Sequence, residues 1–125
     1  MFKLIILIEP QIDMLEFERS WQEFLQQAGK MPGLRREIAS PVYARVHGDL
    51  QVAMIHELYF DSPDDLREAL GSPAGQKAGK ILQTITDGNF TLLFADHLEE
   101  ELKKIVGSQP DGNNEEKDEP RRTRP

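Results

Sequence analysis

Residues 52–65 read VAMIHELYFDSPDD, and this stretch decides the fold. Its first part is rich in aliphatic and aromatic side chains that fall into two alternating sets, as in a β-strand with two different faces. One set contains His56 and the other contains Glu57. The strand runs into Ser62-Pro63-Asp64-Asp65, which combines an N-cap serine, a proline at the first helical position and acids in the first turn. The stretch therefore predicts a strand followed directly by a helix.

The sequence on either side supplies the remaining elements. From the N-terminus we expect a strand over 2–8, a helix over 14–28, an edge or irregular strand within 34–46, the strand over 52–60, a helix in two pieces over 63–71 and 73–87, a strand over 90–95 and a short helix over 98–106. This order, βαββαβ, predicts the α+β class and a ferredoxin-like fold with a four-stranded antiparallel sheet.

The first strand, FKLIILI at residues 2–8, is apolar on both of its alternating sets. A sheet whose helices lie on one side leaves the other face open, so this strand needs a second cover. A second copy of the same sheet would provide one and would remove exposed edges. We therefore expect a homodimer whose two sheets form a dimeric α/β barrel.

Composition limits the domain and its partners. Residues 107–125 contain no aliphatic or aromatic side chain, so we expect one folded domain over 1–106 and a disordered polar tail over 107–125. The net charge of -7 argues against nucleic-acid and membrane partners. The chain has no cysteine, which fits a reducing compartment, and we expect a cytoplasmic protein.

Glu57 is the main candidate for chemistry, because it is an acid in the middle of a strand. If its face lines the barrel, burial would raise its pKa and suit it to proton transfer. Alternatively, Glu57 is a structural carboxylate paired with Lys3 or Arg35. His56 points to the opposite face, where we expect a hydrogen-bonded core histidine.

Other residues complete the expected ligand site. Tyr43 and Tyr59 would donate hydrogen bonds, and Arg35 would bind a carboxylate or phenolate or else pair with an acid. The apolar wall is assigned to four residues: Ile5, Leu7, Ile55 and Leu93. We expect no metal, because His97 with Glu100 and Glu101 lacks further ligands nearby. The motifs of nucleotide, flavin and haem sites are missing, so we expect no cofactor.

Several segments resemble the EthD-like family of small dimeric α/β-barrel proteins. The matching segments are Phe17 and Trp21 at F-x-x-x-W spacing, PGLRR at 32–36, ELYFDS at 57–62, and Ser72-Pro73 with Gly75-Gln76. The resemblance covers roughly residues 2–95. The sequence departs from the family at Leu25, where many relatives carry histidine, and at Glu37, where they carry an aromatic residue.

The resemblance implies a ferredoxin-like monomer, a dimeric barrel and a cavity for a small organic molecule. Related barrels include cofactor-independent monooxygenases, cyclases and isomerases. The family likeness also matches Glu57 to the family's strand acid. We therefore expect a protein that binds a small apolar or aromatic compound, or a cofactor-free oxidoreductase, isomerase or cyclase-like enzyme. The alternative is a non-catalytic structural or regulatory dimer, which the loss of the histidine at Leu25 favours.

Overall fold

The computed structural model describes residues 1–99. Its elements in chain order are β1 (Phe2–Ile8), α1 (Met14–Ala28), β2 (Arg36–Pro41), β3 (Met54–Phe60), α2 (Pro63–Gly71), α3 (Pro73–Thr86) and β4 (Phe90–Asp96). The helix expected over 98–106 and the tail expected over 107–125 lie outside the described residues, apart from positions 98 and 99. Among the helices of residues 1–99, none has the length and apolar character needed to cross a membrane.

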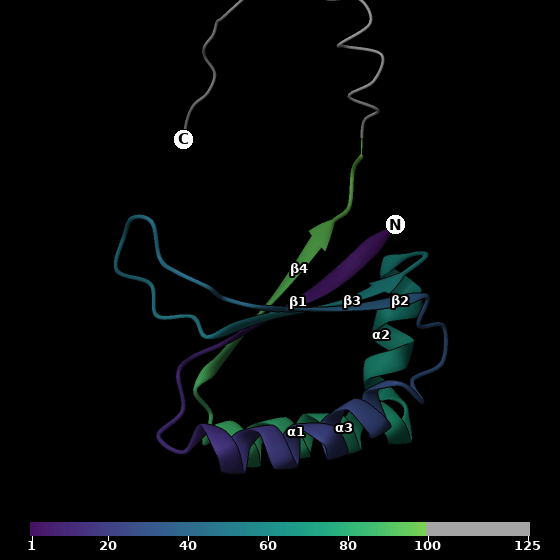
Figure 1. The fold of residues 1–125 in the computed structure, drawn as a ribbon. Coiled ribbons are helices and arrows are strands. Elements are labelled where there is room, and N and C mark those ends of the chain that lie inside the picture. The colour runs from purple at the N-terminus through teal and green to yellow at the C-terminus, as the bar shows by residue number, and fades with distance from the viewer. Residues whose placement is uncertain (100–125) are drawn as a thin grey trace, which may run out of the picture.

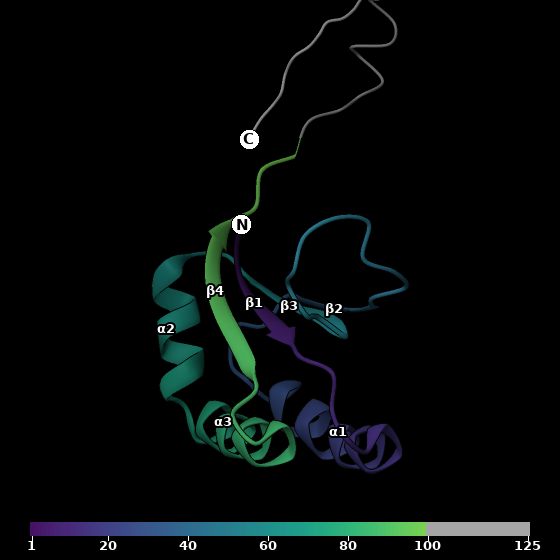
Figure 2. The same cartoon turned by 90° about the vertical axis from the view of Figure 1, so that its left-hand side faces the viewer.

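The four strands form one sheet in the order β2-β3-β1-β4, with every neighbouring pair antiparallel. All three helices lie on the same side of this sheet (Figures 1 and 2). The long loop between β2 and β3 rises on the opposite side. This arrangement confirms the α+β, ferredoxin-like fold with a four-stranded antiparallel sheet.

The capping residues in the sequence predicted the helix starts correctly. The side chain of Asp13 accepts a hydrogen bond from the backbone N–H of Glu16, and Ser62 and Ser72 cap α2 and α3 in the same way. Gly75 is required where α2 meets α3, because a Cβ there would lie 2.1 Å from the carbonyl oxygen of Ala69.

The strands are shorter at their ends than expected. β2 covers only Arg36–Pro41 of the stretch 34–46, and β3 begins at Met54 rather than at residue 52. β2 ends at Pro41, which has no N–H to donate, and β2 lies at the edge of the sheet. Its position at the edge agrees with the expectation for this stretch.

The hydrophobic core lies between the sheet and the helices. The sheet contributes buried apolar side chains from its two central strands, and α1 contributes three aromatic rings. The central residues are Leu4, Ile6, Ile8, Leu58 and Phe60 on the sheet, and Phe17, Trp21 and Phe24 on α1. Because strand side chains alternate, the intervening residues of β1 and β3 point away from this core. We call their side of the sheet the open face.

Candidate functional site

The open face is a grid that the strand register defines. Four residues lie across the sheet in each row, taken in the order β2, β3, β1 and β4. The first row is Arg36, Tyr59, Lys3 and Ala95; the second is Ile38, Glu57, Ile5 and Leu93; the third is Ser40, Ile55, Leu7 and Thr91. The first row is thus basic and aromatic, whereas the second holds one carboxylate among three aliphatic side chains.

Glu57 stands at the junction of the basic and the apolar rows. Its Oε2 lies 3.1 Å from Lys3 Nζ, and its Oε1 accepts a hydrogen bond of 3.1 Å from the Tyr59 hydroxyl. The side chain of Glu57 is 20% exposed and that of Lys3 is 16% exposed. The pairing with Lys3, one of the two alternatives raised from the sequence, is therefore present in the folded chain.

The electrostatics of Glu57 differ from the expectation of a raised pKa. Burial by itself would raise the pKa of Glu57, but the hydrogen bonds from Lys3 and Tyr59 and the positive charges of Lys3 and His97 outweigh burial and lower the pKa. The same contact with Glu57 outweighs burial at Lys3 and raises the pKa of its ammonium group. Glu57 is thus a carboxylate held ionised, and a hydrogen-bond acceptor at neutral pH.

Tyr59 is the centre of the basic row. Its ring lies 4.4 Å from the Arg36 guanidinium carbon and 5.3 Å from Lys3 Nζ, and the edge of the His97 ring meets it at 4.9 Å between centroids. These neighbours leave Tyr59 only 2% exposed, although it belongs to the open face. The Tyr59 hydroxyl donates its hydrogen bond to Glu57, so Tyr59 orients the carboxylate directly.

The structure gathers five of the expected ligand residues and separates two. The five that share the open face with Glu57 are Ile5, Leu7, Ile55, Tyr59 and Leu93.

Tyr43 lies fully exposed in the loop between β2 and β3, away from these rows in the register. Arg35 binds Asp61, with Nη2 at 2.7 Å and Nε at 3.0 Å from Oδ2. The arginine beside Tyr59 is Arg36, which the sequence analysis did not select. The alternation of Arg35 and Arg36 showed that one of them faces this way, but only the pairing of Arg36 with Tyr59 decides which.

A hollow of about 220 Å³ adjoins the third row of the open face. Leu7 and Thr91 form its floor on the sheet, and residues 49–52 of the β2–β3 loop lie over it. Glu9 and Asp49 also line it, so its outer end carries two acids. The open face therefore has a concave end, lined by both aliphatic and acidic side chains, opposite its basic row.

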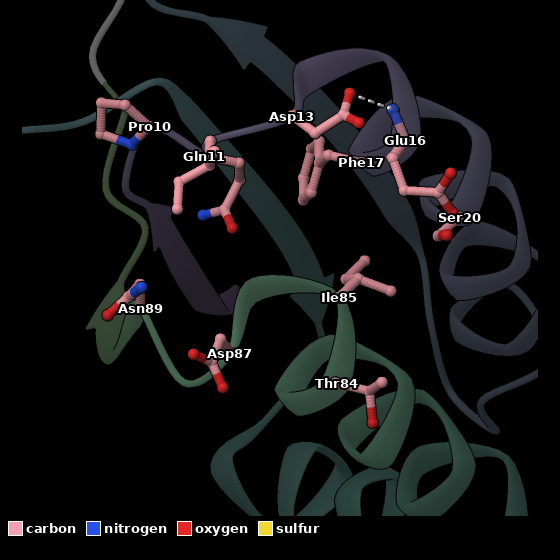
Figure 3. Close-up of a pocket in the computed structure, with 11 residues that line it drawn as sticks. Pro10, Gln11, Asp13, Glu16, Phe17, Ser20, Thr84, Ile85, Asp87 and Asn89 are labelled. Atoms are coloured by element: carbon pink, nitrogen blue, oxygen red, sulfur yellow. Dashed lines mark hydrogen bonds between the residues drawn. The ribbon is translucent and has the colours of Figure 1, made fainter.

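A second hollow, of about 350 Å³, lies at the end of the helical layer (Figure 3). It is enclosed by the β1–α1 loop, the first turns of α1 and the end of α3, with Phe17 and Ile85 among three acids: Asp13, Glu16 and Asp87. Asp13 is already used to cap α1. None of the site residues expected from the sequence lines this hollow.

The helix-covered face holds His56, as expected. His56 is 1% exposed, its Nε2 lies 2.7 Å from Glu37 Oε2, and its ring meets the Trp21 and Phe24 rings edge-on. It is therefore a hydrogen-bonded core histidine. Among residues 1–99 no group of three acidic, histidine or cysteine side chains could hold a metal ion. The trio of His97, Glu100 and Glu101 falls partly outside the described residues.

No protein-family model and no curated protein sequence matches the chain. Solved structures do share its fold. An EthD (ethyl tert-butyl ether D) family protein from Bacillus halodurans matches with a TM-score of 0.73 and 24% identity, covering 78% of this chain and 99% of that one.

Two further structures extend the likeness. A dimeric ferredoxin-like protein of unknown function from Jannaschia matches with a TM-score of 0.61 and 15% identity, covering 77% of this chain and 98% of that one. SnoaB, a cofactor-independent oxygenase from Streptomyces nogalater, matches with a TM-score of 0.60 and 14% identity, covering 79% of this chain and 94% of that one.

The chain is thus an α+β protein with the ferredoxin-like fold. The resemblance to the EthD-like family is supported at the level of this fold.

Proposed function

We propose that this chain is an EthD-like small-molecule-binding protein whose ligand lies on the open face of the sheet. One observation carries the proposal: an apolar sheet face that presents a single ionised carboxylate, Glu57, oriented by Lys3 and Tyr59. Binding sites of this kind combine a mostly apolar wall with a few oriented polar groups. We place the protein in the cytoplasm, as its cysteine-free sequence predicts.

We propose further that two copies pack their open faces together to form a barrel. The face and its surroundings expose large apolar side chains, which single domains rarely leave in water. Leu93 on the open face is 45% exposed, and Tyr43, Val46 and Leu50 of the β2–β3 loop are more exposed still. A second copy would cover these side chains and would enclose the hollow next to Leu7. The dimeric architecture of the ferredoxin-like protein from Jannaschia supports this reading.

Glu57 can accept a hydrogen bond from any ligand that carries a donor. Each oxygen of an ionised carboxylate can accept a further hydrogen bond beyond the ones from Lys3 and Tyr59. A ligand hydroxyl or amide N–H placed over the second row would donate to it. The same carboxylate could take a proton from an activated carbon or phenol, although its lowered pKa makes it a weak base. We assign Glu57 as the polar anchor first and as a proton acceptor second.

A non-catalytic dimer is the second candidate, and a specific observation favours it. Leu25 stands where many EthD-like proteins carry histidine, and here it packs against the hydrophobic core. Among residues 1–99 the open face thus gains no ionisable group from position 25. A protein of this kind would bind without turning over its ligand.

Two measurements test the proposal. Light scattering on the purified chain should give the mass of a dimer, and a monomer at micromolar concentration would contradict the barrel.

A thermal-shift screen of small aromatic compounds should find binders that stabilise the wild type. Those binders should lose most of their effect on Glu57→Gln and keep it on Glu68→Gln, a control on the exposed side of α2. If every binder acts equally on Glu57→Gln, Glu57 is structural. Incubation of a binder with the protein, followed by mass spectrometry, then separates the enzyme from the non-catalytic dimer.

A further inference from the structure

We propose that Arg36 makes the open face selective for carboxylates: the ligand is an elongated apolar acid whose carboxylate binds the Arg36 guanidinium. The inference rests on the proposed ligand site and adds the chemical class of the ligand. The sequence analysis gave this carboxylate-binding role to Arg35, and the inference gives it to Arg36.

The geometry of Arg36 supports this role. Its guanidinium lies over the Tyr59 ring at 4.4 Å, and Tyr59 is held in place by its hydrogen bond to Glu57. Stacking on a fixed ring orients the planar guanidinium while leaving its N–H edges available. A carboxylate accepts two parallel N–H groups from such an edge, which gives both strength and direction.

Arg36 is the basic group beside Tyr59 that has no ion-pair partner among residues 1–99. Within residues 1–99, the other basic groups near Tyr59 have partners: Lys3 pairs with Glu57, and His97 lies 2.8 Å from Glu99. Arg36 has no ion pair within 4 Å in the same part of the chain, whereas Arg35, Arg19 and Arg67 each have one. The pKa of the Glu99 carboxylate is lowered, mainly by the hydrogen bond from His97 and to the smallest extent by the charge of Arg36. Arg36 is therefore close enough to act on a carboxylate in this region.

The apolar part of the ligand has a defined place. From the first row the face continues through Ile38, Ile5 and Leu93 to the third row and its hollow. Leu7 lies four positions after Lys3 in β1, which is about 13 Å along a strand.

The far end of the face sets the ligand's orientation. Glu9 and Asp49 line the hollow there, so a carboxylate at that end would be repelled. The acid group therefore belongs at Arg36, and the apolar body points toward Leu7.

The experiment compares two probes of matched shape on the full chain. Biphenyl-4-carboxylate and biphenyl-4-methanol differ in charge and share their apolar body. Calorimetry at pH 7.5 should show the wild type binding the carboxylate at least tenfold more tightly than the alcohol. In Arg36→Gln this preference should disappear through loss of carboxylate affinity, while the affinity for the alcohol stays within twofold.

Arg35→Gln is the matched control, because it removes an equal charge from the adjacent position, where Arg35 binds Asp61 instead of facing Tyr59. It should keep the preference. Arg36→Lys keeps the charge but loses the paired N–H groups of the guanidinium. Its preference for the carboxylate probe should lie between those of the wild type and Arg36→Gln. Thermal unfolding of each variant shows that it is folded.

The outcomes separate the inference from the proposed function. Equal binding of the two probes by the wild type, or a preference that survives Arg36→Gln, overturns the role of Arg36 and leaves the ligand site in place. Loss of the preference in Arg35→Gln assigns it to general charge and also overturns the inference. If the wild type binds neither probe at millimolar concentration, the proposed apolar ligand site fails as well.

Discussion

The two faces of the same sheet contrast sharply. The face under the helices holds the hydrophobic core on its central strands, where Ile6, Leu58 and Phe60 are each at most 1% exposed. The open face carries equally apolar residues, such as Ile5 and Ile55, that the described chain leaves only partly covered. Adjacent residues therefore have very different surroundings. One side of the sheet is thus packed against helices of its own chain, whereas the other side lacks such a cover among residues 1–99.

The contrast extends to the polar residues. His56 and Glu57 are neighbours in β3, and each has one charged or hydrogen-bonding partner on its own face: Glu37 for His56 and Lys3 for Glu57. On the covered face, aromatic rings enclose His56, whereas Glu37 at the sheet edge is 26% exposed. On the open face the pair stays in reach of water and of a ligand. Similar pairs thus lie on both faces of the sheet, one beside the aromatic core and one on the open face.

The largest difference in stability between the two faces should appear when the neighbours Ile6 and Ile5 are each replaced by alanine. Ile6→Ala removes a side chain from the closed core and should lower the free energy of unfolding by about 2–5 kcal/mol. Ile5→Ala should cost clearly less in the monomer, because water already reaches that side chain. Urea denaturation at two protein concentrations checks this.

In a dimer, the cost of Ile5→Ala should grow with protein concentration, whereas the cost of Ile6→Ala should not. Equal, concentration-independent costs at the two positions would show that the open face is packed within one chain.

An intermediate effect is expected for the buried histidine. Glu37→Leu leaves His56 enclosed by aromatic rings without its hydrogen-bond partner and should cost about 1–3 kcal/mol. Glu37→Gln keeps an oxygen that can accept from His56 and should cost less. Denaturant unfolding of both variants checks the order. A Leu variant as stable as the wild type would show that Glu37 contributes nothing to the covered face.

A smaller effect is expected on the open face at low pH. Because the pKa of Glu57 is lower in the folded chain than in the unfolded chain, the unfolded chain takes up the proton first as the pH falls. The stabilisation is therefore complete at neutral pH and is lost as the pH falls below the usual glutamate value of about 4.3. We expect a loss of up to about 1 kcal/mol, since the pair is partly exposed.

Glu57→Gln should be less stable than the wild type at pH 7 and should lose less on acidification to pH 3. Unfolding curves at the two pH values, with Glu68→Gln as the control, check this. A Glu57→Gln protein that loses as much stability as the wild type would assign the acid sensitivity to other carboxylates.

The smallest effect is expected for Arg35, at the edge of the sheet. Its ion pair with Asp61 is exposed on both sides, so Arg35→Gln should change the free energy of unfolding by no more than about 1 kcal/mol. The change should shrink further in 0.5 M salt. A loss as large as that of Glu37→Leu would mean that this pair belongs to the folded core.

Much of the fold could be predicted from the sequence, because its signals are local. Ser62 and Ser72 announce helices through side chains that cap the next turn, and alternation assigns His56 and Glu57 to opposite faces. The ends of β2 and β3 were less predictable, since strand ends depend on which residues find partners across the sheet. The sequence left open whether burial raises the pKa of Glu57 or a partner lowers it, because the contact with Lys3 on the neighbouring strand depends on the register.

The sequence by itself determined the order of the elements, the two-faced character of β3 and the candidacy of Glu57, because periodicity and capping act over a few residues. Only the tertiary structure decided which arginine stands beside Tyr59 and that Lys3 meets Glu57. These contacts join residues more than twenty positions apart, and the antiparallel register sets them. A shift of one residue in the pairing of β2 would have exchanged Arg35 for Arg36. The composition of the open face is therefore a property of the assembled sheet.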